Sequence, residues 1–324
     1  MNDVIIIGAG PGGYETAILA AEKGLKTKLI EKRELGGTCL NRGWIPTKTL
    51  LHASEFLNTE EYAKLGLSGN RPQLDLKQLQ AYKNEVIEKL RSGIELQLKK
   101  AKVELIHGNA QIVGAHQVAV NGEILEAEHI ILASGSRPSM PSFIPRLKNV
   151  MTSDELLEYD QPIRHLVIIG GGVIGMELAT AYSRFGAKVT VVEAMPKLLP
   201  MMDGELTAQM RKIMESRGVK IMTEAKVQSV EAAAVGAKVQ VEVGGKIQAF
   251  EAEKVLVAVG RRTDTEALGL DKVGIAHDRG RITVNDKMET NVPNIYAIGD
   301  CLGKVMLAHV ASAQGEVAAE NALG

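Results

Sequence analysis

Two stretches of the chain, VIIIGAGPGG (residues 4–13) and VIIGGGVIG (residues 167–175), carry the same glycine spacing. Each follows a run of β-branched residues and opens a segment with helical periodicity, so each predicts a strand, a tight turn and a helix. Glycines in this pattern let the backbone approach a pyrophosphate at the positive end of the helix dipole. The glycines of the two copies are Gly8, Gly10 and Gly13, and Gly170, Gly172 and Gly175.

An acidic residue follows each glycine pattern at the same distance. Glu31 follows Gly8 as Glu193 follows Gly170, and each ends the next predicted strand. A carboxylate at this point accepts hydrogen bonds from the ribose hydroxyls of an adenosine. One such motif alone is a weak indication. Two, with matching acids, predict two bound dinucleotides and electron transfer between them.

The composition narrows the class of protein. A length of 324 residues with 45% hydrophobic residues favours two domains with full cores. The formal net charge of −1 argues against bulk attraction to nucleic acid or membrane. No apolar run reaches the roughly 20 residues that span a bilayer, the two cysteines cannot form a disulfide framework, and the seven histidines show no metal-ligand spacing. We expect a soluble cytoplasmic protein without a metal site.

The order of the motifs predicts an α/β fold with two Rossmann-like dinucleotide-binding domains, the second inserted into the first. The first domain is expected over residues 1–149 and 276–324, and the second over residues 150–275. A long charged helix is predicted from Leu76 to Lys100. The charged stripe on this helix is expected on a solvated face; it comprises Lys83, Glu85, Glu88, Lys89 and Arg91.

Further motifs resemble one family, the flavoprotein disulfide reductases, and within it the dihydrolipoamide dehydrogenases. The resemblance runs through the whole chain and rests on GAGPGGYETAILAA, ELGGTCLNRGWIPTKTLL, ASGSRP, IIGGGVIGMELA, VLVAVGRRTDT, NIYAIGD and MLAHVASAQGEVAAEN. It implies that the first glycine loop binds FAD and the second NAD(H).

The resemblance also implies which residues serve each cofactor. The FAD contacts it implies are Gly8, Gly10, Pro11, Gly12, Gly13, Glu31, Lys32, Gly37, Thr38, Cys39, Lys48, Ala110, Ser134, Gly135, Asp300, Met306, Leu307, Ala308 and His309. The NAD contacts are Gly170, Gly172, Val173, Ile174, Gly175, Glu177, Glu193, Val227 and Gly260. Glu193 with no arginine nearby favours NADH over NADPH. Lys48 and Glu177 are expected to pair beside the flavin.

The chain departs from the family pattern at the redox centre. The family carries C-x-x-x-x-C, whose disulfide takes electrons from the flavin; here Cys39 stands first and Trp44 second. Cys39 would be the remaining exchange thiol, and an indole cannot exchange with a disulfide. We therefore expect the lipoamide half-reaction to be lost. The indole either stacks on the flavin ring or packs nearby as an inactivating substitution.

The second departure is at the C-terminus, because the family continues into an interface domain with a catalytic His–Glu pair. Its absence here is expected to leave a monomer, and together with Trp44 it suggests an engineered, truncated flavoprotein. The predicted function is a diaphorase-like NADH oxidation that passes electrons to non-thiol acceptors. The alternative is a monomeric FAD-binding scaffold without useful turnover, and reduction by NADH separates the two.

Overall fold

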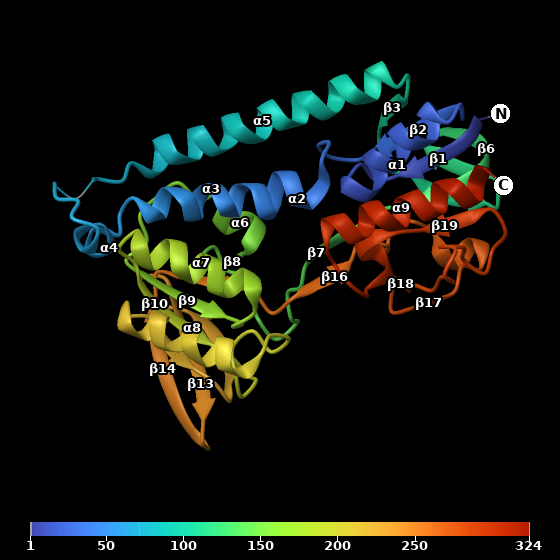
Figure 1. The fold of residues 1–324 in the computed structure, drawn as a ribbon. Coiled ribbons are helices and arrows are strands. Elements are labelled where there is room, and N and C mark those ends of the chain that lie inside the picture. The colour runs from blue at the N-terminus through green and yellow to red at the C-terminus, as the bar shows by residue number, and fades with distance from the viewer. Residues whose placement is uncertain (1, 71, 324) are drawn as a thin grey trace. The chain divides into compact units, whose positions relative to one another are not determined.

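A computed structural model of the chain describes residues 2–70 and 72–323. The chain forms two compact units (Figure 1). The first comprises Met1–Ile45, Val86–Arg137 and Arg262–Gly324, and the second Pro46–Glu85 and Pro138–Arg261. These borders differ from the predicted ones, because residues 46–85 and 138–149 group with the second unit and residues 262–275 with the first.

The grouping of residues 46–85 has a packing cause. Leu50 of helix α3 (Trp44–Glu55) and Leu76 and Leu79 of helix α5 (Leu76–Lys100) are buried in the apolar cluster of the second unit. An amphipathic helix pattern predicts that a helix has an apolar face, but not which core that face joins. The predicted bounds of α5 are confirmed.

The first unit is built on a parallel sheet in the strand order β3-β2-β1-β6-β19. Its strands are β1 (Asn2–Ile7), β2 (Thr27–Glu31), β3 (Glu104–His107), β6 (Glu123–Leu132) and β19 (Ile295–Ala297). The first half of β6 also pairs antiparallel with β5 (Gln117–Val120), and β5 with β4 (Gln111–Gly114). β1 is buried along almost its whole length, as its run of isoleucines predicts.

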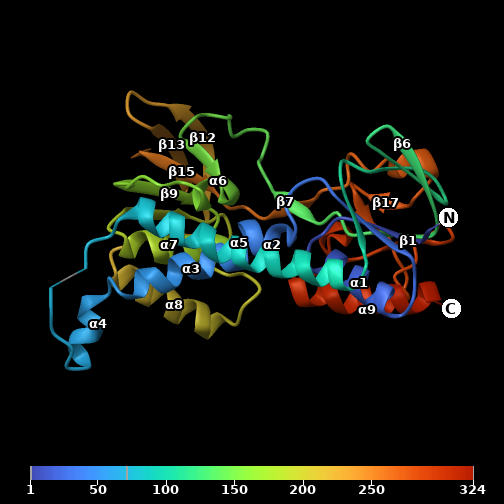
Figure 2. The same cartoon turned by 90° about the horizontal axis from the view of Figure 1, so that it is seen from above.

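Helices α1 (Pro11–Glu22) and α9 (Ala308–Leu323) lie side by side in this unit, as Figures 1 and 2 both show. Small residues permit their close approach. A Cβ on Gly315 would clash with the Thr16 hydroxyl, and one on Gly12 would lie 3.1 Å from the Ala311 Cβ. Gly12, expected to contact the cofactor, therefore has a packing role between helices as well.

The second unit repeats this plan with a parallel sheet in the order β11-β10-β9-β15-β8. Its strands are β8 (Val150–Thr152), β9 (His165–Ile169), β10 (Lys188–Val192), β11 (Lys220–Met222) and β15 (Lys254–Val257). An antiparallel meander of β12 (Ala225–Ala232), β13 (Ala237–Val243) and β14 (Lys246–Ala252) precedes β15. The strand at the edge next to β6 or β15 differs in its place along the chain. In the first sheet it is β19, the last strand in the sequence, and in the second it is β8, which precedes the other four.

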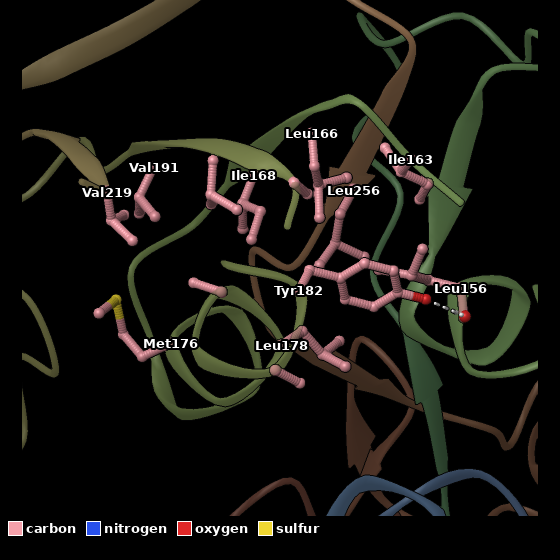
Figure 3. Packing of buried hydrophobic residues seen from close by; sticks show 14 of the residues in the cluster. Leu156, Ile163, Leu166, Ile168, Met176, Leu178, Tyr182, Val191, Val219 and Leu256 are labelled. Carbon is pink, nitrogen blue, oxygen red and sulfur yellow. Dashed lines mark hydrogen bonds between the residues drawn. The ribbon is translucent and has the colours of Figure 1, made fainter. Parts of the chain in front are cut away.

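Helices α6 (Ser153–Leu157), α7 (Val173–Arg184) and α8 (Gly204–Ser216) belong to the second unit. Its core is shown in Figure 3, where the buried Tyr182 donates its hydroxyl to the Leu156 carbonyl at 3.1 Å. Lys83 was expected on a solvated face, but its side chain is fully buried. Its ammonium donates to the Leu157 carbonyl at 2.8 Å and pairs with Glu158, which satisfies the charge. Burial lowers the pKa of Lys83, and Glu158 opposes that shift.

The remaining elements are short. They are α2 (Gly37–Arg42), α4 (Thr59–Lys64), β7 (Ser136–Pro138), β16 (Arg261–Thr263), β17 (His277–Asp278), β18 (Arg281–Ile282) and the 3₁₀ turns η1 (Leu270–Val273) and η2 (Gly299–Leu302). Within residues 2–70 and 72–323, no helix combines the length and apolar character needed to cross a bilayer.

Candidate functional site

The first glycine loop joins β1 to α1, and two of its glycines are required by the chain itself. Gly8 has φ +107°, and a Cβ there would clash with the Ala133 carbonyl. A Cβ on Gly13 would clash with the Gly8 carbonyl. Gly10 differs, because its Cβ would meet only the Gly37 Cα at 3.8 Å, an ordinary contact. Internal packing does not demand glycine there, whereas close approach of a ligand does.

The second loop, between β9 and α7, has the same three roles. Gly170 has φ +112°, and a Cβ there would clash with the Ala258 carbonyl. A Cβ on Gly175 would clash with the Gly170 carbonyl, while one on Gly172 would meet no described atom within 4 Å. α1 and α7 begin after Gly10 and Gly172 without a side-chain cap. Both helices therefore present backbone N–H groups suited to an anion.

The two acids hold equivalent positions. The buried Glu31 accepts the N–H groups of Ala9 and Arg33, each at 2.7 Å. Glu193 is also buried and accepts those of Gly171 at 2.6 Å and Met195 at 2.7 Å. Each carboxylate is thus fixed beside its glycine loop, and each oxygen keeps a lone pair for a ribose hydroxyl.

A pocket in the first unit opens beside Gly8 and Glu31. Its wall includes Asn109, Ala110 and Ser134. The Ser134 hydroxyl is buried and makes no hydrogen bond within the part of the chain that the structure describes. An unpaired buried hydroxyl beside a fixed acid fits a polar ligand such as an adenosine diphosphate group. The residues present therefore fit the dinucleotide that the first loop predicts.

Most of the expected FAD contacts lie in the first unit. Gly37, Thr38 and Cys39 start α2, and a Cβ on Gly37 would lie 2.5 Å from the Gly10 Cα, so α2 begins against the glycine loop. Asp300 in η2 accepts the Ser136 hydroxyl at 2.5 Å. Lys32 follows Glu31, Gly135 follows Ser134 with φ +73°, and Met306, Leu307, Ala308 and His309 lead into α9. Lys48 is the exception, because it lies in the second unit.

The backbone of Trp44 lies next to the thiol of Cys39 in the first unit. The Trp44 N–H donates to the Cys39 sulfur, and the Trp44 residue is 59% exposed at the start of α3. Burial raises the pKa of the Cys39 thiol; the Trp44 hydrogen bond lowers it, and the carboxylates of Asp300 and Glu15 raise it further. Cys39 is a free thiol disfavoured as thiolate.

Cys301, the other free cysteine, is fully buried and donates to the Ile298 carbonyl at 3.0 Å. Burial raises the pKa of Cys301 to about 12. It is a core residue, and burial disfavours its reactive thiolate form.

Lys48 of α3 and Glu177 of α7 form an ion pair within the second unit, and both are partly buried. α7 begins at Val173, which is 53% exposed, followed by Ile174. Val227 lies in β12, and Gly260 has φ +116° with open space around its Cβ position. All the expected NAD contacts thus fall in one unit.

One residue that lines the pocket was not among the cofactor contacts predicted from the sequence. Asp264 lines the same pocket as Glu31 and accepts the ammonium of Lys32 at 2.7 Å. It lies in the stretch VLVAVGRRTDT, which marks the family, but it is 232 positions away from Lys32 and the motif does not indicate that contact. In the described residues no group of three His, Cys, Asp or Glu side chains is placed to hold a metal ion.

Comparison with known proteins gives consistent matches. The family model described as pyridine nucleotide-disulphide oxidoreductase matches residues 2–315. A dihydrolipoyl dehydrogenase of Thermus scotoductus is 45% identical over 99% of this chain and 71% of its own length. One of Bacillus subtilis is 38% identical, with 99% and 72% covered. Among solved structures, the HOCl-induced flavoprotein disulfide reductase RclA of Escherichia coli is similar with a TM-score of 0.87, 29% identity, and 99% and 71% covered.

Proposed function

Because the chain belongs to the pyridine nucleotide-disulphide oxidoreductase family, we propose that it binds FAD and NADH and passes electrons from NADH to non-thiol acceptors. Dihydrolipoyl dehydrogenases, the type it matches, bind FAD and NAD(H). FAD supplies the acceptor for a two-electron hydride transfer. Quinones, redox dyes and oxygen are acceptors that need no protein thiol.

The contact between Trp44 and Cys39 carries the proposal. The resemblance places the second redox cysteine at Trp44, and the N–H of that position reaches the Cys39 sulfur. The backbone of position 44 therefore lies beside the Cys39 thiol, and Trp44 brings an indole there in place of a second thiol. Since an indole neither forms a disulfide nor relays electrons as a thiolate, the thiol half-reaction is lost while the two dinucleotide loops stay intact.

The choice of NADH follows from Glu193 and its surroundings. The fixed carboxylate would accept the ribose hydroxyls of NADH and repel the 2′-phosphate of NADPH. Lys197 is the nearest basic residue in sequence, and its ammonium donates to the Met202 carbonyl at 2.8 Å. The Lys197 ammonium is thus engaged by a backbone carbonyl.

The start of α9 suits the flavin end of the site. The helix begins at Ala308 and runs for 16 residues, so its first N–H groups carry a positive partial charge. We propose that the N–H groups at Leu307, Ala308 and His309 face the carbonyl edge of the flavin. Negative charge arises there on reduction, and the helix terminus would stabilise it.

The proposal is tested by steady-state turnover of the FAD-loaded protein. We expect NADH oxidation with a quinone or a dye as acceptor, and NADPH at least ten times less effective in kcat/KM, a difference of about 1.4 kcal/mol. With dihydrolipoamide and NAD⁺ we expect no NADH formation. A flavin-loaded protein that oxidises NADH with neither acceptor would contradict the proposal, and so would turnover with dihydrolipoamide.

Replacing Lys48 by methionine should lower the reduction potential of the flavin. The resemblance implies that the Lys48 ammonium, which pairs with Glu177, serves the reactive end of the flavin, where a positive charge favours the reduced form. Glu177→Gln removes the opposing charge and should raise the potential. Potentials measured against a redox dye check both variants. Identical potentials in the two variants would leave the pair only a structural link between α3 and α7.

A further inference from the structure

Besides Ile7, Gly8 and Ser134, the pocket beside Glu31 is lined by three segments that are distant in sequence. They contribute Ile30 to Lys32, Gly108 to Ala110, and the stretch containing Asp264, Ala267 and Leu268. All three belong to the first unit. A dinucleotide whose adenosine end enters this pocket is surrounded by all three, so the links between them decide how readily the pocket opens.

Three interactions connect these segments, and two of them are hydrogen bonds between backbone groups. The Gly108 N–H donates to the Glu31 carbonyl at 2.9 Å, which extends the pairing of β2 with β3. The Ile112 N–H donates to the Leu268 carbonyl at 2.8 Å. Each of these bonds extends or joins regular structure, so breaking one disturbs the fold around it.

The third link joins two side chains. The Lys32 ammonium pairs with the Asp264 carboxylate at 2.7 Å, and both residues line the pocket. Side chains can separate by rotation alone, without loss of backbone structure. Of these three links, this ion pair is the one that can open and close on a protein that stays folded.

Contacts other than the one with Lys32 also hold Asp264 in place. Its N–H donates to the Gly135 carbonyl at 3.0 Å, and Arg137 lies 3.8 Å from its second carboxylate oxygen. Arg137 also pairs with Glu266. The carboxylate is therefore oriented before Lys32 reaches it, which reduces the entropy lost when the pair forms.

We propose that the Lys32–Asp264 ion pair is a latch that closes the adenosine pocket and slows the release of FAD. This rests on the proposed function, because it assigns the pocket to the adenosine end of FAD. The latch predicts a dissociation rate of FAD that rises with salt, since ions screen a partly exposed pair. It adds Asp264 to the residues that retain the cofactor.

The test compares FAD release from the holoprotein and its variants, followed by the rise of flavin fluorescence after dilution. We expect Asp264→Asn and Lys32→Met each to release FAD about two- to fivefold faster at low salt, the effect of losing a partly exposed ion pair. Raising NaCl from about 20 to about 500 mM should accelerate release from the wild type and change the variants little.

Lys28→Met is the matched control. Lys28 lies on β2, the strand that ends just before Lys32, and it pairs with Glu104 on β3, outside the lining of this pocket. The FAD release rate of this variant should equal the wild-type rate. Wild-type release rates in both latch variants, or equal acceleration by Lys28→Met, would overturn the latch alone. A folded protein that takes up no FAD would overturn the proposed function and the latch together.

Discussion

Replacing Trp44 by cysteine should create a disulfide with Cys39. The Trp44 N–H contacts the Cys39 sulfur, which places the backbone of position 44 beside the thiol. A disulfide also requires the two Cβ atoms to lie about 3.5–4.5 Å apart, and the variant tests that requirement. The wild type has two free cysteines. The oxidised variant should show only Cys301 as a titratable thiol after denaturation. Anaerobic NADH, added before denaturation, should expose all three thiols, because the restored disulfide would again accept electrons.

The serine variant of the same position is the control for this experiment. Trp44→Ser removes the indole without supplying a thiol, so its thiol count should equal that of the wild type with and without NADH. A cysteine variant that keeps three thiols under oxidising conditions would show that the backbone at residues 39–44 does not permit the bond.

Two alanine substitutions in the second glycine loop should change different properties: Gly175→Ala the stability of the fold, and Gly172→Ala the binding of NADH. Gly175→Ala introduces a Cβ that clashes with the Gly170 carbonyl, so we expect a loss of stability of about 1–3 kcal/mol or more. Gly172→Ala meets no described atom, so we expect the melting temperature to be nearly unchanged. Its methyl group would instead occupy the approach of the pyrophosphate. We expect the KM for NADH to rise at least about tenfold while FAD stays bound.

Thermal unfolding and an NADH titration on both variants check this pair of predictions. The first loop provides a replicate, since Gly13 matches Gly175 in its clash and Gly10 matches Gly172 in lacking one. There, cofactor loss should appear in the FAD content. If Gly172→Ala lowered the melting temperature as much as Gly175→Ala, the open position would have a structural role. If it left the KM for NADH unchanged, the loop would not bind the pyrophosphate.

The two glycine loops could be predicted because their requirement is local. A strand that turns sharply into a helix at Gly8 or Gly170 needs positive φ, and glycine spacing in a few adjacent residues indicates that need. The clash that a Cβ would make with Ala133 or Ala258 comes from a distant part of the chain and adds to the same requirement. The acids Glu31 and Glu193 follow from the same unit, because β2 and β10 each return beside the loop.

Long-range packing could not be predicted in the same way. Leu50, Leu76 and Leu79 show an apolar face, yet their place in the core of the second unit depends on tertiary contacts. The sequence pattern predicts Lys83 on a solvated helix face, because the pattern does not show the partners that allow its burial. The fold brings the Leu157 carbonyl and the Glu158 carboxylate to its ammonium. The contact of Asp264 with Lys32 likewise depends on how the chain returns to the first unit.

For the site residues too, local features could be predicted from the sequence and long-range contacts could not. Gly12 belongs to the loop in sequence, and its neighbour Ala311 on α9 reveals a packing role that the motif does not contain. The resemblance located Trp44 at the redox position, while the hydrogen bond to Cys39 locates its backbone.

The most direct measurement is the visible absorbance spectrum of the FAD-loaded protein under anaerobic conditions, recorded after NADH and, in a separate sample, after dihydrolipoamide. We predict that NADH bleaches the flavin band and that dihydrolipoamide leaves it unchanged, because the chain keeps both dinucleotide loops and, on the proposed function, Trp44 supplies no second thiol to relay electrons. A flavin that stays oxidised with NADH, or one that dihydrolipoamide bleaches, would contradict this account.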